Sequence, residues 1–289
     1  VSNSEMRSFS GGVGAIRFDA GGEVVDAYQI LKNTSINCAG GPTPWGTWLS
    51  CEEFTHGQVY ECDPMGRNPS AVRPALGAFR HEAVAVDSEN KCLYLTEDHP
   101  AGAFYRFRPD HPLPDLSSGQ LEIASVVARN GKSFIEWIAV PDPLAIVEAT
   151  RLQVPSYAVF RGGEGIALYE GRAYFTTKHD NRVWVYHTNT QELEVLYDVK
   201  TSDNPILTGV DNVVITPTGD VLIAEDGGDM QIVVLTDEGS VAPLLQVVGH
   251  EKSEITGPAF DPSYQRLYFS SQRGSLGKSS GGITYEVSR

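Results

Sequence analysis

A repeated unit of short apolar strands constrains the fold of this chain more than any other feature. The unit consists of an apolar strand, a tight turn, a second strand that ends in polar or charged residues, and one or two further strands. A partial unit covers 1–32, and further units begin near residues 38, 82, 164, 211 and 257. Repeats of roughly 40–50 residues with this content are typical of β-propeller blades.

We therefore expect an all-β fold, a six-bladed β-propeller with four-stranded blades, formed as a single domain over 1–289. The first and last blades are expected to be incomplete, because 1–32 reads as strands two to four and 257–289 lacks an outer strand. A segment upstream of Val1 would then close the ring and could carry an export signal.

One insertion interrupts the repeats, at 129–160, and we expect it on the pocket face as a cap or as a mere excursion. Within it, 142–153 is the one candidate helix, with Asp142 as N-cap and Pro143 at the first helical position.

Propeller geometry predicts which residues meet. The first strand of each blade lines the axis and the second returns beside it, so the start of the first and the end of the second share one face. On that face, the starts of the first strands are expected to carry Cys38, His81-Glu82, Gly163-Glu164, Asp211-Asn212 and Thr256-Gly257. On the same face, the ends of the second strands are expected to carry Asn3-Glu5, Glu52-Glu53, Glu97-Asp98, Lys178-His179, Glu225-Asp226 and Gln272-Arg273. Asp87, Asp220 and Asp261 fall on the opposite face and are expected to form turns.

Carboxylates crowded in this way cannot all stay ionised without cations between them. Oxygen ligands suit Ca²⁺, and the thiolate of Cys38 suits a transition metal such as iron. Each residue also has a plainer interpretation. A single acid at a strand end is commonly a turn residue, and a single cysteine is commonly a small buried hydrophobe.

Composition narrows the function classes. A net charge of −15 argues against nucleic acid as a partner, and fits either cation binding or simple solubility. No apolar run approaches the ~20 residues of a membrane helix. The cysteines form no zinc pattern, and Cys51, Cys62 and Cys92 lie inside strand patterns, where we expect core positions.

Several motifs in order resemble the PhoX-type alkaline phosphatase family. They are NCAGG with TPWGTWLSCEE, HEA at 81–83, GEGIA at 163–167, GVDNV at 209–213, AEDG at 224–227, and ITGPAF followed by LYFSSQRG. The resemblance implies a propeller that holds ferric iron and calcium ions with an oxo group, in enzymes that hydrolyse phosphate esters and are typically exported to the periplasm or secreted.

The resemblance also implies roles for individual residues. Cys38 matches an iron-bridging cysteine, and the matched metal-binding acids are Glu5, Glu52, Glu53, Glu82 and Glu164. Asp211 and the pair Glu225-Asp226 fit either calcium binding or a supporting role behind the metal ligands. The candidates for holding phosphate oxygens are Arg273, Lys178 and Arg161. The family commonly has arginine and proline directly before the EGI glutamate, whereas here the run is FRGGEGIA, so Arg161 lies one residue further from Glu164.

The predicted reaction is phosphate ester hydrolysis by a monomer, with a metal-bound oxygen as nucleophile. No GxSxG motif suggests a serine nucleophile instead. Two alternatives remain open from the sequence: a calcium-dependent lactonase or esterase on a propeller, and a non-catalytic metal-bearing scaffold.

Overall fold

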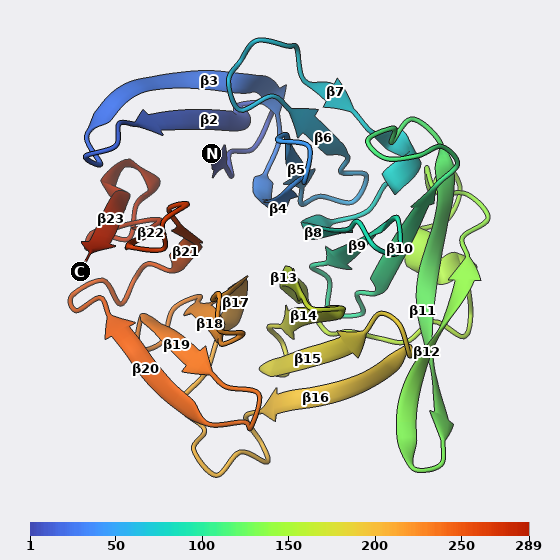
Figure 1. Ribbon diagram of the computed structural model, residues 1–289. Coiled ribbons are helices and arrows are strands. Elements are labelled where there is room, and N and C mark those ends of the chain that lie inside the picture. Colours follow the sequence, from blue (N-terminus) through green and yellow to red (C-terminus); the bar gives the residue numbers. More distant parts are fainter. Residues whose placement is uncertain (289) are drawn as a thin grey trace. The chain divides into compact units, whose positions relative to one another are not determined.

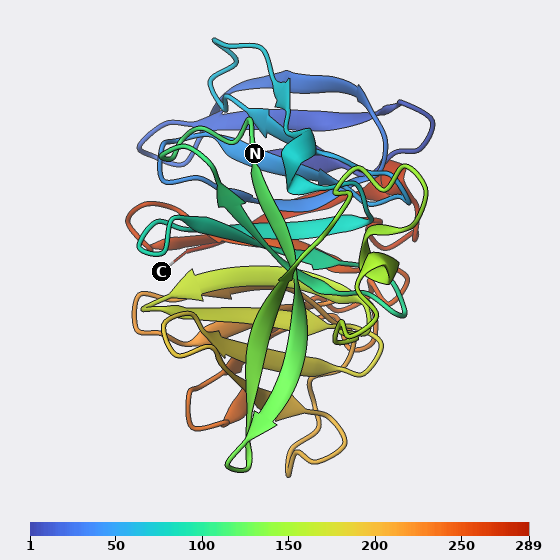
Figure 2. The same cartoon turned by 90° about the vertical axis from the view of Figure 1, so that its right-hand side faces the viewer.

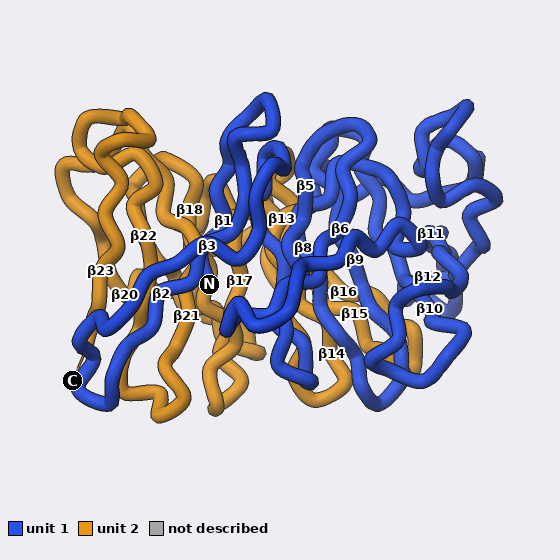
Figure 3. The backbone as a smooth tube through the Cα atoms, turned by 90° about the horizontal axis from the view of Figure 1, so that it is seen from above, with its two compact units in different colours: residues 1–163 blue, residues 164–289 orange. Residues whose placement is uncertain are grey.

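The computed structural model describes residues 1–288, which form two compact units: unit 1 covers 1–163, and unit 2 runs from Glu164 onward (Figure 3). Antiparallel strands dominate both units, which confirms the predicted all-β class (Figure 1). Among the described residues, helical structure is confined to three short 3-10 turns, η1 (Pro74–Leu76), η2 (Thr150–Gln153) and η3 (Ser279–Gly281). No helix in the described part of the chain is long and apolar enough to cross a membrane.

Unit 1 contains three runs of paired strands that follow the sequence order. The first has three strands, β1 (Ser2–Ser4), β2 (Gly11–Phe18) and β3 (Val24–Thr34). The second has four, β4 (Asn37–Pro42), β5 (Trp48–Glu52), β6 (Val59–Cys62) and β7 (Ala71–Val72). The third comprises β8 (His81–Asp87), β9 (Cys92–Glu97), β10 (Phe104–Pro109), β11 (Gly119–Arg129) and β12 (Lys132–Ala139). Strands β11 and β12 form a long twisted hairpin (Figure 2).

Unit 2 repeats the same meander. One run comprises β13 (Gly163–Tyr169), β14 (Arg172–Thr177), β15 (Arg182–His187) and β16 (Glu192–Asp198). A four-stranded sheet follows, β17 (Val210–Ile215), β18 (Val221–Glu225), β19 (Gln231–Leu235) and β20 (Val241–Gln246). The last sheet has three strands, β21 (Ile255–Phe260), β22 (Arg266–Ser271) and β23 (Ile283–Ser288). Sheet size therefore varies, and three strands in the first and last sheets match the shorter repeats there.

Turn chemistry is as the sequence predicts. Asp87 accepts a hydrogen bond from the Asn90 amide at 2.9 Å, and Asp261 accepts one from the Gln265 amide at 2.9 Å. Asp220 accepts one from the Thr218 hydroxyl at 2.7 Å. In each case the carboxylate satisfies a donor within its own turn and closes the link between the first two strands of a run.

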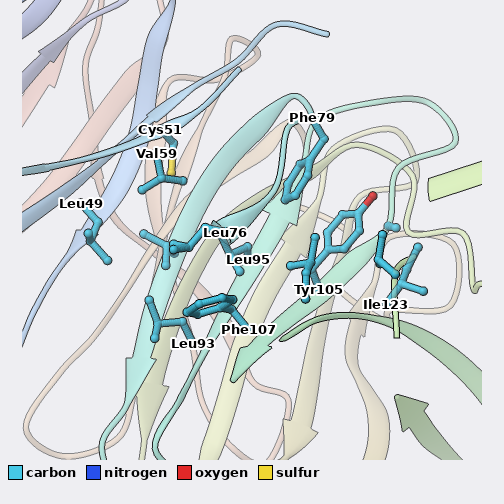
Figure 4. Packing of buried hydrophobic residues seen from close by; sticks show 14 of the residues in the cluster. Leu49, Cys51, Val59, Leu76, Phe79, Leu93, Leu95, Tyr105, Phe107 and Ile123 are labelled. Atoms are coloured by element: carbon cyan, nitrogen blue, oxygen red, sulfur yellow. The ribbon is translucent and has the colours of Figure 1, made fainter. Parts of the chain in front are cut away.

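Alternating side chains from neighbouring sheets fill the core of each unit. In unit 1, Phe79 stacks on Tyr105 with ring centroids 4.2 Å apart, beside Leu49, Leu95 and Ile123 (Figure 4). Each fully buried apolar side chain of this size stabilises the fold by roughly 1.5–3 kcal/mol. Cys51, Cys62 and Cys92 are at most 2% exposed, so their predicted core positions are confirmed.

The prediction of a helix over 142–153 was wrong. Only η2 forms, because the carboxylate of Asp142 accepts hydrogen bonds from the amides of Leu144 and Ile146, at 3.1 and 2.8 Å, and fixes a turn. Ala145 then has a φ of 53°, which a right-handed helix does not allow. The same cap residue that suggested a helix thus closes a local turn.

Candidate functional site

Bulges interrupt the pairing near the start of the first strand in several sheets. Pairing shifts register between Asn37 and Gly40 in β4, between His81 and Val84 in β8, between Val210 and Val213 in β17, and between Thr256 and Ala259 in β21. Three of the predicted metal ligands lie inside these irregular stretches, namely Cys38, Glu82 and Asp211. A bulge turns a side chain away from its regular alternation, and bulges often occur beside active sites.

The NCAGG motif supplies the close packing that β4 needs. A Cβ added at Gly41 would lie 1.9 Å from the carbonyl oxygen of Val84 in β8. One added at Gly40 would lie 1.9 Å from the carbonyl oxygen of Leu49 in β5. Only glycine at these two positions lets the strand carrying Cys38 approach both neighbours so closely.

A buried glutamate ends the second strand of three sheets: Glu52, Glu97 and Glu225. One carboxylate oxygen of each accepts the backbone amide six residues further on. The donors are Gln58 at 3.2 Å, Ala103 at 3.1 Å and Gln231 at 3.1 Å. We call these three residues the clamp glutamates, because they fix the loop that follows the strand.

The other oxygen of each clamp glutamate binds a second segment. Glu52 accepts the Ser35 amide at 2.9 Å, Glu225 accepts the Thr208 amide at 2.9 Å, and Glu97 pairs with Arg151 at 2.7 Å. Burial raises the pKa of Glu225 to about 7, and the backbone hydrogen bonds oppose that rise. Glu52 and Glu225, which the sequence placed among the metal ligands, therefore already use both carboxylate oxygens to hold loops.

The first acidic group lies in unit 1 and consists of Glu5, Cys38 and Glu53. One ligand atom from each lies within 4.8 Å of the other two. Asn3 orients the end of β1 toward β4, because its side-chain amide donates to the Cys38 carbonyl at 3.0 Å. Burial raises the pKa of Glu53 to about 7, although Arg80 partly offsets this. A thiol and two carboxylates at this spacing fit a transition metal such as iron.

The second acidic group lies in unit 2 and consists of Asp211, Asp226 and Glu254, again with ligand atoms within 4.8 Å of one another. Burial and the charge of Asp226 raise the pKa of Glu254 to about 8. A raised pKa is the direction expected for a carboxylate that is crowded by another carboxylate. A set of three carboxylates fits a hard cation such as Ca²⁺.

Basic side chains face these acids. In unit 2 the Lys178 ammonium lies 2.9 Å from Glu164 and 3.3 Å from Asp226, and the Arg273 guanidinium lies 3.1 Å from Glu254. Glu164 is buried at the start of β13. In unit 1, Glu82 is fully buried in β8, and Arg161 is exposed in the loop before β13.

Sequence reasoning missed Glu254 and Arg80, and it named Glu225 rather than Asp226 as the ligand of their pair. Glu254 was overlooked because the first strand of the last sheet was expected to start at 256–257, whereas β21 begins at Ile255, directly after Glu254. Asp226 was expected at the pocket face only as part of the pair Glu225-Asp226. Arg80 precedes the HEA motif and carried no signal of its own, although its guanidinium pairs with Glu53.

The family model described as alkaline phosphatase PhoX matches residues 19–192 and 161–274. The chain belongs to the alkaline phosphatase PhoX family. This confirms the family that the motifs indicated, and the PhoX membership identifies the chain as a hydrolase of phosphate esters. No curated protein sequence matches the chain.

Solved structures share the fold at low sequence identity. Pseudomonas fluorescens PhoX in complex with vanadate, a transition state analogue, is 17% identical with a TM-score of 0.73, and the match covers 99% of this chain and 75% of that one. A chain of a nidogen/laminin complex is 10% identical with a TM-score of 0.59, over 94% of this chain and 84% of that one. A putative 6-phosphogluconolactonase from Bacteroides fragilis is 10% identical with a TM-score of 0.52, over 99% and 92%.

Proposed function

We propose that this PhoX-family chain is a metal-dependent phosphatase that uses ferric iron and calcium. The observation that carries the proposal is the first acidic group, where a thiol and two carboxylates from three separate strands or strand ends lie within 4.8 Å of one another. Turn-forming or solubilising acids have no reason to gather around a cysteine.

The ligand atoms of the two acidic groups favour different metals. Glu5, Cys38 and Glu53 would hold iron, because a thiolate prefers a transition metal. Asp211, Asp226 and Glu254 would hold calcium, because all their donors are carboxylate oxygens. Glu82 and Glu164 stay in the proposal as further metal ligands, because both are buried acids at the starts of first strands.

The protein's own basic residues would then handle the phosphate. Bound metal ions would neutralise phosphate charge and activate the attacking oxygen. Lys178 and Arg273 are held by the acids that we assign to metal binding, so each would lie beside the phosphoryl group and stabilise its charge. Arg161 is exposed and remains a candidate for a third phosphate contact.

The finer architecture belongs to the same proposal. We infer one six-bladed propeller domain, in which 129–160 borders the pocket, and an exported monomer that acts in the periplasm or outside the cell. The likeness to Pseudomonas fluorescens PhoX over 99% of this chain supports the shared fold. The family membership supports the exported location.

Elemental analysis of protein purified without chelator tests the proposal, together with parallel assays of p-nitrophenyl phosphate and a simple lactone. We expect iron, calcium and phosphatase activity. Cys38→Ala should lose iron and activity while keeping its circular dichroism spectrum, whereas Cys62→Ala, which removes a core thiol of the same unit, should keep iron. Calcium alone with lactone hydrolysis would favour the lactonase alternative, and a metal-free, inactive protein would favour a scaffold.

A further inference from the structure

Arg80 lies between two acidic strand ends in unit 1. It forms an isolated antiparallel bridge with Glu53, and its amino group Nη2 donates to the Glu53 carboxylate. The same Nη2 atom lies 3.8 Å from Asp98, which follows β9. The Arg80 side chain is 35% exposed, compared with 10% for Glu53 and 17% for Asp98, so Arg80 is the most accessible of the three side chains.

Not all hydrogen-bond donors of the Arg80 guanidinium are engaged in these two ion pairs. Both of its ion pairs engage Nη2, and the buried Nε atom has no hydrogen-bond partner among the described residues. An arginine keeps its charge at every physiological pH and offers donors in a planar fork. Arg80 therefore retains donor capacity while it is paired with Glu53.

Cation binding would change the partner of Arg80. Glu53 belongs to the first acidic group, so a metal ion there would take the carboxylate that Arg80 now contacts. Two positive charges do not share one carboxylate oxygen without cost. The guanidinium would then lie next to a metal ion with its strongest acceptor removed, which is where a phosphate oxyanion is best bound.

Unit 2 shows the same relation twice. Lys178 pairs with Glu164, and Arg273 pairs with Glu254, so each basic side chain is held by an acid that we assign to metal binding. Arg80 is the corresponding cation in unit 1, and its pairing with a metal-group acid is what distinguishes it from Arg73. Arg73 pairs with Glu61 of β6 at 2.7 Å, and Glu61 belongs to neither acidic group.

We propose that Arg80 is a catalytic residue that binds a phosphate oxygen of the substrate, and that Glu53 holds it in place until a metal ion occupies the first acidic group. This inference rests on the proposed phosphatase function.

Equilibrium binding separates this role from a structural one. Metal-loaded wild type, Arg80→Gln, Arg80→Lys and the control Arg73→Gln are titrated with inorganic phosphate by calorimetry, and iron and calcium are measured in each. We expect Arg80→Gln to bind phosphate about 10- to 100-fold more weakly, the usual effect of losing a charged hydrogen bond. Its metal affinity should be unchanged or higher, because a competitor for Glu53 is gone. Arg80→Lys should lose less, and Arg73→Gln should match wild type.

Three results would decide against the inference. Phosphate affinity within about twofold of wild type in Arg80→Gln would show that Arg80 only neutralises Glu53 in the absence of metal. Loss of metal together with phosphate would show that Arg80 positions Glu53. A wild type that binds neither metal nor phosphate would refute the proposed function itself, and the assignment of Arg80 with it.

Discussion

The Arg151–Glu97 ion pair offers the sharpest test of how the loops are held. Glu97 is fully buried and also accepts hydrogen bonds from the Tyr105 hydroxyl at 3.0 Å and the Ala103 amide at 3.1 Å. Arg151 is 17% exposed and comes from η2, so the pair ties the segment before β13 to the end of β9. Arg151→Ala would leave a buried carboxylate without its cation.

The expected loss follows from that burial. Removing one partner of a buried pair costs about 3–5 kcal/mol in the free energy of unfolding. A chain of this size should then melt roughly 6–12 °C lower. Arg129 and Glu136 form a matched control on the β11–β12 hairpin, because their side chains are 57% and 51% exposed. Exposed pairs contribute about 0–1 kcal/mol, so Arg129→Ala should melt within roughly 2 °C of wild type.

The pH dependence gives a second readout. Burial raises the pKa of Glu97, and Arg151 opposes that rise. Without Arg151 the folded state favours the protonated acid, so it binds more protons than the unfolded chain. The stability deficit of Arg151→Ala should therefore be smaller at pH 5 than at pH 8. Thermal unfolding followed by circular dichroism in chelator measures both effects. An Arg151→Ala variant no less stable than Arg129→Ala would refute the reasoning.

Two further predictions concern the clamp glutamates and the glycine motif. In the presence of chelator, Glu225→Gln should lower the free energy of unfolding by about 1–3 kcal/mol. The reason is that the NH2 group of the glutamine, a donor, would face a backbone N–H that is also a donor. Asp226→Asn should instead lose calcium with little change in that stability, and a calcium content equal to wild type would contradict the division of roles. Gly41→Ala should destabilise by at least about 1–3 kcal/mol in urea unfolding, since its Cβ would lie 1.9 Å from the Val84 carbonyl. Gly14→Ala, whose Cβ would have only ordinary contacts beyond 3.6 Å, should be nearly neutral, and equal losses in both variants would remove the steric explanation.

The repeat and the alternation of apolar residues determined the strands from the sequence alone. Strand boundaries followed from short-range chemistry, as with Asp87, Asp220 and Asp261, whose carboxylates bond within their own turns. The motifs around Cys38 were specific enough to identify the family. The helix expected at 142–153 failed because an Asx turn and a helix cap begin with the same residue type, and only the following backbone distinguishes them.

The tertiary structure decided which acid of each pair belongs to an acidic group. Glu52-Glu53 and Glu225-Asp226 look equivalent in sequence, yet the first residue of each pair binds two backbone amides and the second belongs to an acidic group. Successive side chains of a strand point to opposite sides, so shifting the assignment by one residue reverses the roles. Bulges in β4, β8 and β17 also change the direction in which side chains point. No local sequence pattern encodes this change, because a bulge forms only when the neighbouring strand has paired.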